Sequence, residues 1–313
     1  MDAERVYVLG AGAIGARMAV AVHDAGWPVT LLLRSREALR TFERSNGIEL
    51  REALERRLVR PDAEITQPES ETSVIGRLLI AVKAQQTRSA LSSIRHRLSP
   101  SSHIVFLQNG MGVAETVEDL LPPGAAVVLG TTTEAVWRAG PFNLVHAARG
   151  ETWFGPAPGH PGDPDTAQPL LTAPGLKAGW DPDIRQRLWH KLALNCAINP
   201  LTALLGCRNG VLSTARECLL APICREVETV LNAEGIAYTT PLLDQARALA
   251  HETAANRSSM LQDVVAGRQT EIEHITGYLV DRAAQQGIAV PFNAFLLEAM
   301  RIRQCTAADG ITP

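Results

Sequence analysis

Short, continuous apolar runs separated by helical patterns fill the first half of the chain. The runs are residues 5–9, 29–33, 77–82, 103–107 and 127–131. Between the first two runs, the sequence from Ile14 to Ala25 predicts a helix that Gly26 ends. Strands that are apolar along their whole length, with helices between them, are typical of a parallel sheet covered on both faces. The pattern therefore predicts an α/β domain in the N-terminal part of the chain.

The chain changes character near its middle. Trp153 and Phe154 are expected to end a late strand of this domain, and residues 155–175 are then rich in proline and glycine. Proline removes an amide donor and fixes φ, so this stretch is predicted to be loop. From about residue 183 onward the pattern is helical, with no strong strand signal. We therefore expect a first domain over residues 1–178 and an all-α C-terminal domain over residues 179–313.

Composition and charge narrow the classes of function. The 313 residues are 46% hydrophobic and 20% charged with a net charge of −3, so the chain can bury a core and has no basic excess for nucleic acid or an anionic membrane. The N-terminus lacks the basic start and long apolar stretch of a signal peptide. The five cysteines form no C-x-x-C, and the eight histidines form no H-x-x-x-H. These features favour a cytoplasmic protein with no nucleic-acid partner, no membrane span and no structural metal.

A glycine-rich motif directly follows the first predicted strand. It reads Gly10-Ala11-Gly12-Ala13-Ile14-Gly15. In a G-x-G-x-x-G turn the first glycine allows the tight turn, the second lets the backbone approach a pyrophosphate, and the third lets the helix pack closely on the strand. The free amides at the start of the helix then face the phosphates. The motif in this position predicts a Rossmann-type domain that binds a dinucleotide through residues 10–15.

The end of the second predicted strand indicates which dinucleotide is bound. An NAD site usually has Asp or Glu at this point, bonded to the ribose 2′-hydroxyl. This chain has Arg34 there instead. A guanidinium can pair bidentately with a 2′-phosphate, which a carboxylate would repel. The sequence therefore favours NADP(H).

A polar stripe marks one helix of the predicted C-terminal domain. Lys191, Asn195 and Asn199 recur at every fourth residue, which puts all three on one helix face. A helix stripe that faces solvent is normally rich in Glu and Lys. A lysine followed by two uncharged amides is more typical of the lining of a binding site.

These motifs, taken in order, resemble the ketopantoate reductase (2-dehydropantoate 2-reductase) family nearly from end to end. Besides the glycine motif, Arg34 and the two asparagines after Lys191, the matching segments are Lys83-Ala84-Gln85-Gln86, Gln108-Asn109-Gly110-Met111-Gly112, Trp189-His190-Lys191, Asn209-Gly210, Ser258-Ser259-Met260-Leu261-Gln262-Asp263 and Arg268-Gln269-Thr270-Glu271-Ile272-Glu273. The resemblance implies an NADP-dependent oxidoreductase, a monomer or homodimer, that reduces 2-dehydropantoate to pantoate in pantothenate and coenzyme A biosynthesis.

The resemblance also implies roles for individual residues. Lys191 matches the proton donor of the family. The positions that match substrate-binding residues are Asn109, Asn195, Asn199, Asn209, Ser259 and Glu271. The positions that match cofactor-binding residues are Gly10, Ala11, Gly12, Ala13, Ile14, Gly15, Arg34, Lys83, Gln86, Asn109, Val136 and Glu271.

Elementary chemistry is consistent with the roles of Lys191 and Glu271. Hydride attack on a ketone leaves an alkoxide, and a lysine with a reference pKa of about 10.4 can stabilise that charge and donate a proton. Thr270 followed by Glu273 predicts a capping box at a helix start. Glu271 would then lie in the first turn, where the helix dipole favours the ionised carboxylate. A carboxylate held there suits an acceptor for a hydroxyl group.

One position departs from the family pattern. After Thr131-Thr132-Thr133 the relatives often have His and two small residues, whereas this chain continues Glu134-Ala135-Val136. The side chains of Ala135 and Val136 are still small enough to permit contact between the backbone and a cofactor. A carboxylate at position 134 would change the charge near the site, which bears on the identity of the substrate.

Three other functions fit part of the pattern. A reductase of the same family could act on another 2-oxo acid. A dehydrogenase of the 3-hydroxyisobutyrate type also has a K-x-x-x-N helix, but it usually has a G-x-x-G-x-G stretch before the lysine, and residues 183–190 lack it. A non-catalytic NADP(H)-sensing module would need the glycine turn but not Lys191, the asparagines and Glu271 together.

Overall fold

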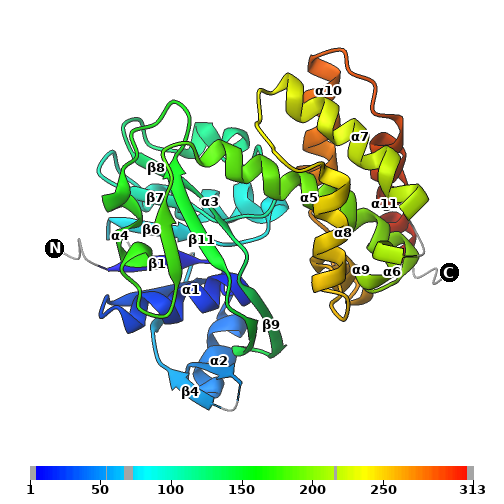
Figure 1. Ribbon diagram of the computed structural model, residues 1–313. Coiled ribbons are helices and arrows are strands. Elements are labelled where there is room, and N and C mark those ends of the chain that lie inside the picture. Colours follow the sequence, from blue (N-terminus) through cyan, green and yellow to red (C-terminus); the bar gives the residue numbers. More distant parts are fainter. Residues whose placement is uncertain (1–4, 54, 67–72, 215–216, 309–313) are drawn as a thin grey trace. The chain divides into compact units, whose positions relative to one another are not determined.

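The computed structural model describes residues 5–53, 55–66, 73–214 and 217–308 (Figure 1). The chain divides into two compact units. The first contains the residues up to 108 together with residues 113–184, and the second contains residues 109–112 together with the residues from 185 onward. The expected domain junction between residues 178 and 179 falls inside a strand of the first unit, and the change of unit comes at residues 184 and 185.

The first unit is built on an eight-stranded sheet. Its strands are β1 (Val6–Leu9), β2 (Val29–Leu33), β5 (Asp62–Ile65), β6 (Arg77–Ile80), β7 (His103–Phe106), β8 (Ala126–Thr132), β11 (Glu151–Pro156) and β12 (Lys177–Trp180). They lie in the order β12-β11-β8-β7-β6-β1-β2-β5. All neighbouring pairs are parallel except β8 and β11, which are antiparallel. The parallel strands predicted from the apolar runs are confirmed.

Helices cover both faces of this sheet. They are α1 (Ala13–Asp24), α2 (Arg36–Ser45), η1 (Ala84–Gln86), α3 (Thr87–Ile94), η2 (Arg95–Arg97), η3 (Glu115–Leu120), η4 (Pro164–Ala167) and α4 (Gln168–Leu171). Along β1, Val6 and Val8 pack into the cluster that contains the buried residues of α1. The alternate residues Tyr7 and Leu9 pack into a second cluster with Leu91 of α3. Because side chains alternate along a strand, a strand buried on both faces must be apolar throughout.

A second, four-stranded sheet lies in the same unit. It consists of β3 (Ile48–Glu52), β4 (Glu55–Val59), β9 (Ala135–Gly140) and β10 (Asn143–Ala148), in the order β4-β3-β10-β9. Strands β3 and β10 pair in parallel although they are far apart in the sequence. Helix α1 packs against strands of both sheets. The apolar runs did not predict this sheet, because its strands are partly exposed and mix polar with apolar residues.

The proline- and glycine-rich stretch after β11 is not all loop, so the prediction for residues 155–175 is wrong in part. Two short helices, η4 and α4, occupy residues 164–171. Asp163 caps the first of them by accepting a hydrogen bond of 3.2 Å from the Thr166 amide. Proline is tolerated in the first turn of a helix, where its missing N–H has no partner to lose.

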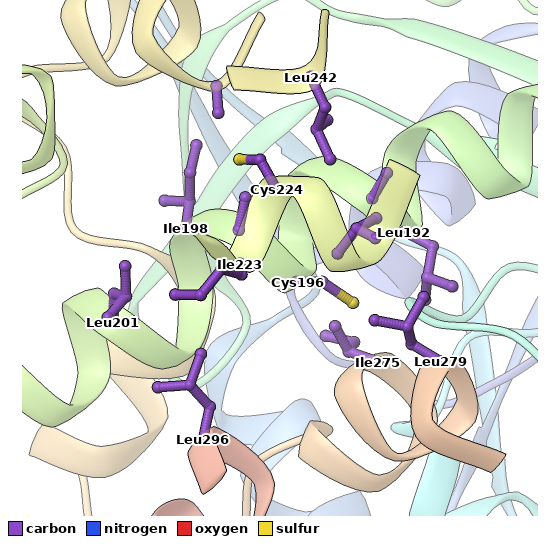
Figure 2. Close-up of a cluster of buried hydrophobic side chains, with 14 of the residues drawn as sticks. Leu192, Cys196, Ile198, Leu201, Ile223, Cys224, Leu242, Ile275, Leu279 and Leu296 are labelled. Carbon is purple, nitrogen blue, oxygen red and sulfur yellow. The ribbon is translucent and has the colours of Figure 1, made fainter. Parts of the chain in front are cut away.

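The second unit is helical throughout its described elements, as predicted. They are α5 (Ile184–Leu205), α6 (Gly210–Thr214), α7 (Glu217–Ala233), α8 (Leu242–Glu252), α9 (Ser259–Val265), the π-helical turn η5 (Glu273–Gly277), α10 (Tyr278–Gln285) and α11 (Pro291–Ala308). Figure 2 shows the core, where Leu192, Cys196 and Ile198 of α5 meet Ile223 of α7 and Ile275 of η5. None of the helices described has the length and apolar character that crossing a membrane requires.

Candidate functional site

The glycine-rich turn between β1 and α1 is shaped by close backbone contacts. Gly10 has a φ of +110°, and a Cβ on it would lie 2.7 Å from the Val82 backbone nitrogen. A Cβ on Gly15 would lie 1.9 Å from the Gly10 carbonyl oxygen. Neither position accepts a side chain, so both glycines are required by the turn and by the packing of α1 on the sheet.

Gly12 is required by neither packing nor backbone conformation. A Cβ at this position would meet no protein atom within 4 Å. Gly12 is the residue before α1, no side chain caps this helix, and its first turn has no acidic residue. Unpaired amides at a helix start together with open space at the second glycine fit a pyrophosphate group. The residues present therefore suit a dinucleotide.

Three of the expected cofactor residues follow neighbouring parallel strands. Leu9 of β1 pairs with Leu32 of β2 on one side and with Ile80 of β6 on the other. The glycine turn after β1, Arg34 after β2 and Lys83 after β6 therefore come from the same edge of the sheet. Ligands of open α/β sheets bind at the carboxyl ends of such strands.

The side chains at this edge differ in their surroundings. Arg34 is exposed, and among the described residues it forms no ion pair. Lys83 precedes η1, and Gln86 is the exposed last residue of that short helix. Val136 is half-buried on β9, in the four-stranded sheet, where it pairs with His146.

Glu134 lies between β8 and β9, and its carboxylate is buried inside the first unit. Oε2 lies 3.2 Å from Arg17 Nε and 2.8 Å from His146 Nε2, which are ion-pair distances without hydrogen-bond alignment. Oε1 accepts a hydrogen bond of 2.8 Å from the Gly150 amide. On the other side of the imidazole, His146 Nδ1 lies 2.7 Å from Glu52 Oε1. The charge of Glu134 is therefore balanced within the unit.

Arg17 and Glu52 complete this buried network. Arg17 Nη2 donates a hydrogen bond to the Gly175 carbonyl. Partial burial opposes the charged form of Glu52, but the hydrogen bond and the charge of His146 outweigh it and lower the pKa of the carboxyl group. Arg17 was not among the residues predicted from the sequence, although an arginine inside the otherwise apolar run of α1 is a signal for a buried charge with a partner.

The helical unit brings Lys191, Asn109 and Glu271 together. Lys191 Nζ donates a hydrogen bond of 2.7 Å to Asn109 Oδ1, and Asn109 Nδ2 donates one of 3.3 Å to Glu271 Oε2. Because an ammonium group only donates and a carboxylate only accepts, the amide can have only this orientation. Asn109 thus bridges a cation and an anion whose positions in the sequence are far from its own.

Burial changes the acidity of Lys191. Removal from water disfavours the ammonium and lowers the pKa of Lys191 to about 8, although the nearby negative charge of Glu271 works in the opposite direction. A general acid is most effective when its pKa lies close to the working pH. Lys191 is therefore poised to donate a proton near neutral pH.

Asn195 and Asn199 follow Lys191 along α5. Asn199 is 6% exposed. Neither asparagine side chain forms a hydrogen bond within the described part of the chain. A buried amide normally has a partner. Asn199 is buried and Asn195 is half-buried, and both lie on the same helix face as the half-buried Lys191, so the two amides suit a polar ligand.

Asn209 and Ser259 lie on other elements of the helical unit. Asn209 precedes α6, and its Nδ2 donates a hydrogen bond of 2.9 Å to Thr253 Oγ1, which leaves its buried Oδ1 without a partner. Ser259 is the exposed first residue of α9. The preceding Ser258 caps α9 and shares a hydroxyl contact of 2.7 Å with Thr202 of α5.

The predicted capping box before η5 does not form. The Thr270 amide, which Glu273 was expected to satisfy, donates instead to Gln304 Oε1 at 2.7 Å. Glu273 pairs with Arg301, whose guanidinium lowers the pKa of this carboxyl group against partial burial. Both competing groups come from α11, which the local sequence pattern does not include.

His190, the neighbour of Lys191, is occupied by a contact of 2.7 Å with the Ala237 carbonyl.

Family models match both parts of the chain. Residues 6–159 match the model "Ketopantoate reductase PanE/ApbA", and residues 183–304 match "Ketopantoate reductase PanE/ApbA C terminal". A 2-dehydropantoate 2-reductase from Salmonella typhimurium is 40% identical over 230 residues, which cover 72% of this chain and 74% of the relative. One from Vibrio cholerae is 34% identical over 300 residues, covering 95% of this chain and 96% of the relative.

Solved structures share the fold. The PanE/ApbA family ketopantoate reductase from Ralstonia eutropha has a TM-score of 0.86 at 28% identity, covering 97% of this chain and 99% of that one. D-mandelate dehydrogenase, solved with NADH and anilino(oxo)acetate, has a TM-score of 0.85 at 21% identity, with the same coverage. At this lower identity the likeness shows the fold alone.

The Glu134 network leads to a prediction about stability. Replacing Glu134 by Gln leaves Arg17 and His146 buried without their shared anion, so the free energy of unfolding should fall by about 3–5 kcal/mol. Urea denaturation measures it. Glu55→Gln, an exposed glutamate of the same four-stranded sheet, is the matched control and should change stability by less than about 0.5 kcal/mol. Equal effects of the two substitutions would contradict the role given to the network.

Proposed function

The chain belongs to the ketopantoate reductase family, and on this premise we propose that it reduces 2-dehydropantoate to pantoate with NADPH. The family is one of oxidoreductases that use a nicotinamide cofactor. The observation that carries the proposal is the hydrogen-bonded group of Lys191, Asn109 and Glu271, beside which Asn195 and Asn199 present amides without partners. We also propose a cytoplasmic location and a monomer or homodimer.

In the proposed mechanism the bound NADPH supplies the hydride. Lys191 stabilises the charge that develops on the ketone oxygen and donates a proton to it. Asn109 holds the lysine in place, and Asn195, Asn199 and Asn209 offer neutral hydrogen-bond groups to the substrate. Ser259 donates to the substrate carboxylate, whereas Glu271 accepts from a hydroxyl, because two carboxylates repel each other.

In the first unit, the glycine turn and Arg34 would hold the cofactor. The open space at Gly12 and the uncapped start of α1 suit the pyrophosphate, and the exposed guanidinium of Arg34 suits a 2′-phosphate. Lys83 and Gln86 would lie around the adenosine phosphate, and Val136 and Asn109 would contact the cofactor. The residues directly after β2, Arg34 and Ser35, offer no carboxylate to favour NADH.

One assay tests the function directly. The purified protein is mixed with NADPH and either 2-dehydropantoate or a panel of other 2-oxo acids, and the absorbance of the reduced nicotinamide is followed. We expect the highest kcat/KM with 2-dehydropantoate. Turnover of other 2-oxo acids with none of 2-dehydropantoate would assign the enzyme a different substrate, and no turnover of any would refute the reductase.

The choice of cofactor depends on Arg34. Arg34→Ala removes a charge-assisted contact to the 2′-phosphate, so KM for NADPH should rise about 10- to 100-fold, while KM for NADH stays within about twofold. Steady-state kinetics with both cofactors measures the difference. Arg40→Ala, an exposed arginine on α2, is the control and should affect neither. An equal loss with NADPH and NADH would show that Arg34 does not bind the 2′-phosphate.

The proton donor predicts a pH dependence. Lys191 must be protonated to donate, so reduction should be fastest below its pKa of about 8 and fall as the pH rises through that value. Glu271→Gln removes a charge that raises this pKa, so the alkaline limb should move to lower pH. The chain has three lysines, Lys83, Lys177 and Lys191, so NMR of the lysine-labelled free protein can measure the titration directly.

Removal of the lysine provides the matching kinetic test. Lys191→Ala should lower kcat about 10²- to 10⁴-fold with little change in NADPH affinity, because the proposed pyrophosphate site belongs to the other unit. Lys177→Ala, which changes an exposed lysine at the start of β12, should leave kcat unchanged. Near-normal kcat in Lys191→Ala would remove Lys191 from the mechanism.

The roles of Glu271 and Ser259 can be separated with two acids. The first is 2-dehydropantoate, and the second is a branched 2-oxo acid without the terminal hydroxyl. Glu271→Gln weakens the acceptor for that hydroxyl, so kcat/KM should fall about tenfold more for 2-dehydropantoate than for the second acid. Ser259→Ala should reduce both about equally, since both substrates have the carboxylate. Equal losses in Glu271→Gln would assign Glu271 to cofactor positioning.

A further inference from the structure

Residues 109–112 belong to the helical unit, although the chain before and after them belongs to the other unit. The segment Asn109-Gly110-Met111-Gly112 is held there by its backbone. The Met111 amide donates a hydrogen bond of 2.9 Å to the carbonyl of His274, in the π-helical turn η5. The Met111 side chain packs against the core of the helical unit. The segment is thus attached to the unit that contains Lys191 and Glu271.

Both glycines of the segment are in close contact with the same short stretch of chain. Gly110 has a φ of +84°, and a Cβ on it would lie 2.2 Å from the His274 carbonyl oxygen. Gly112 has a φ of +79°, and a Cβ on it would lie 2.9 Å from a ring carbon of Tyr278. No other residue type combines these backbone angles with such close approach. The two glycines let the segment lie directly against residues 274–278.

The π-helical turn also contacts the helix that carries Lys191. Ile275 packs in the same core cluster as Leu192 and Cys196 of α5. The Tyr278 ring lies 5.6 Å from the ring of Trp189, two residues before Lys191. Glu271 lies two residues before the turn. Short π-helical turns are frequent at functional sites, where they interrupt regular helix geometry. Residues 271–278 therefore include Glu271 and contact both the segment that carries Asn109 and the helix that carries Lys191.

We propose that His274 is a positioning residue whose backbone carbonyl, together with Gly110 and Gly112, fixes Asn109 between Lys191 and Glu271. The proton donor is then assembled within the helical unit before substrate binds. We assign this role to the carbonyl, which accepts the hydrogen bond from the Met111 amide, and not to the ring. Burial lowers the pKa of His274, although a hydrogen bond between the ring and the Met111 backbone works in the opposite direction. The inference rests on the proposed function for its catalytic consequence, but not for the attachment itself.

Gly110→Ala tests the proposal, because the added methyl cannot fit beside the His274 carbonyl. We expect kcat to fall at least tenfold. Gly235→Ala is the matched control, since Gly235 has a similar φ of +69° and a Cβ on it would meet no atom within 4 Å. Gly235→Ala introduces a similar conformational strain at a positive φ but no steric clash, so kcat should stay within twofold. Retained kcat in Gly110→Ala, or an equal loss in both variants, would overturn the proposal.

Hydrogen exchange of the free protein provides a readout that needs no activity. The Met111 amide should exchange slowly in the parent and in Gly235→Ala, and at least tenfold faster in Gly110→Ala. Fast exchange in the parent would overturn the attachment whatever the enzyme reduces. An inactive parent with a protected Met111 amide would instead refute the proposed function and leave the attachment in place.

Two further variants separate the carbonyl from the ring and guard against misfolding. His274→Leu keeps the carbonyl, so kcat should stay within threefold and the Met111 amide should stay protected. A loss above tenfold with protection retained would assign the function to the ring and overturn the proposal. If Gly110→Ala does not fold, Gly112→Ala replaces it, because its Cβ meets only the edge of the Tyr278 ring. It should lower kcat and protection together, and an unchanged variant would contradict the proposal.

Discussion

The helical unit keeps a lysine ammonium largely out of water, and much of the surrounding structure compensates for that burial. Removal from water lowers the pKa of Lys191, and the nearby carboxylate of Glu271 limits the decrease. Asn109 accepts a hydrogen bond from the ammonium and donates one to the carboxylate, so a neutral amide connects the two charges. Each group restricts the others: Asn109 gives the ammonium an acceptor, and Glu271 gives it a nearby negative charge. The glycines at positions 110 and 112 follow from the need to bring this amide close to η5.

In the first unit, the order of the strands decides which residues of the proposed cofactor site lie at the same edge of the sheet. Strand β1 lies between β2 and β6, so segments that leave the sheet after these three strands share one edge. The glycine turn, Arg34 and Lys83 are distant in sequence and meet only because the strands are parallel and adjacent. The turn itself depends on backbone approach, since no Cβ fits at Gly10 or Gly15.

The same unit contains a buried ionic network with a different function. Arg17, Glu134 and His146 connect α1, the β8–β9 connection and β10 through contacts between charged groups away from water. Such networks contribute little net stability compared with apolar packing, but removing one member leaves an unpaired buried charge. The carboxylate at position 134 is therefore part of the structural framework, which explains how the chain accommodates a residue that departs from the family pattern.

Local periodicity was enough to predict much of this protein. The five apolar runs, the first helix, the glycine turn and the face shared by Lys191, Asn195 and Asn199 all depend on residues close together in the sequence, where strand and helix periods can be read directly. The second sheet could not be predicted in this way, because β3 and β10 pair across a long separation and are only partly apolar. The capping box at Thr270 failed for a related reason: Gln304 and Arg301 of α11 compete for the groups that would have formed it. Likewise, only the tertiary structure attached Asn109 to the helical unit and buried Glu134 against Arg17 and His146. In each case the deciding partner is remote along the chain, and a local pattern contains no information about which remote group will desolvate or neutralise a polar side chain.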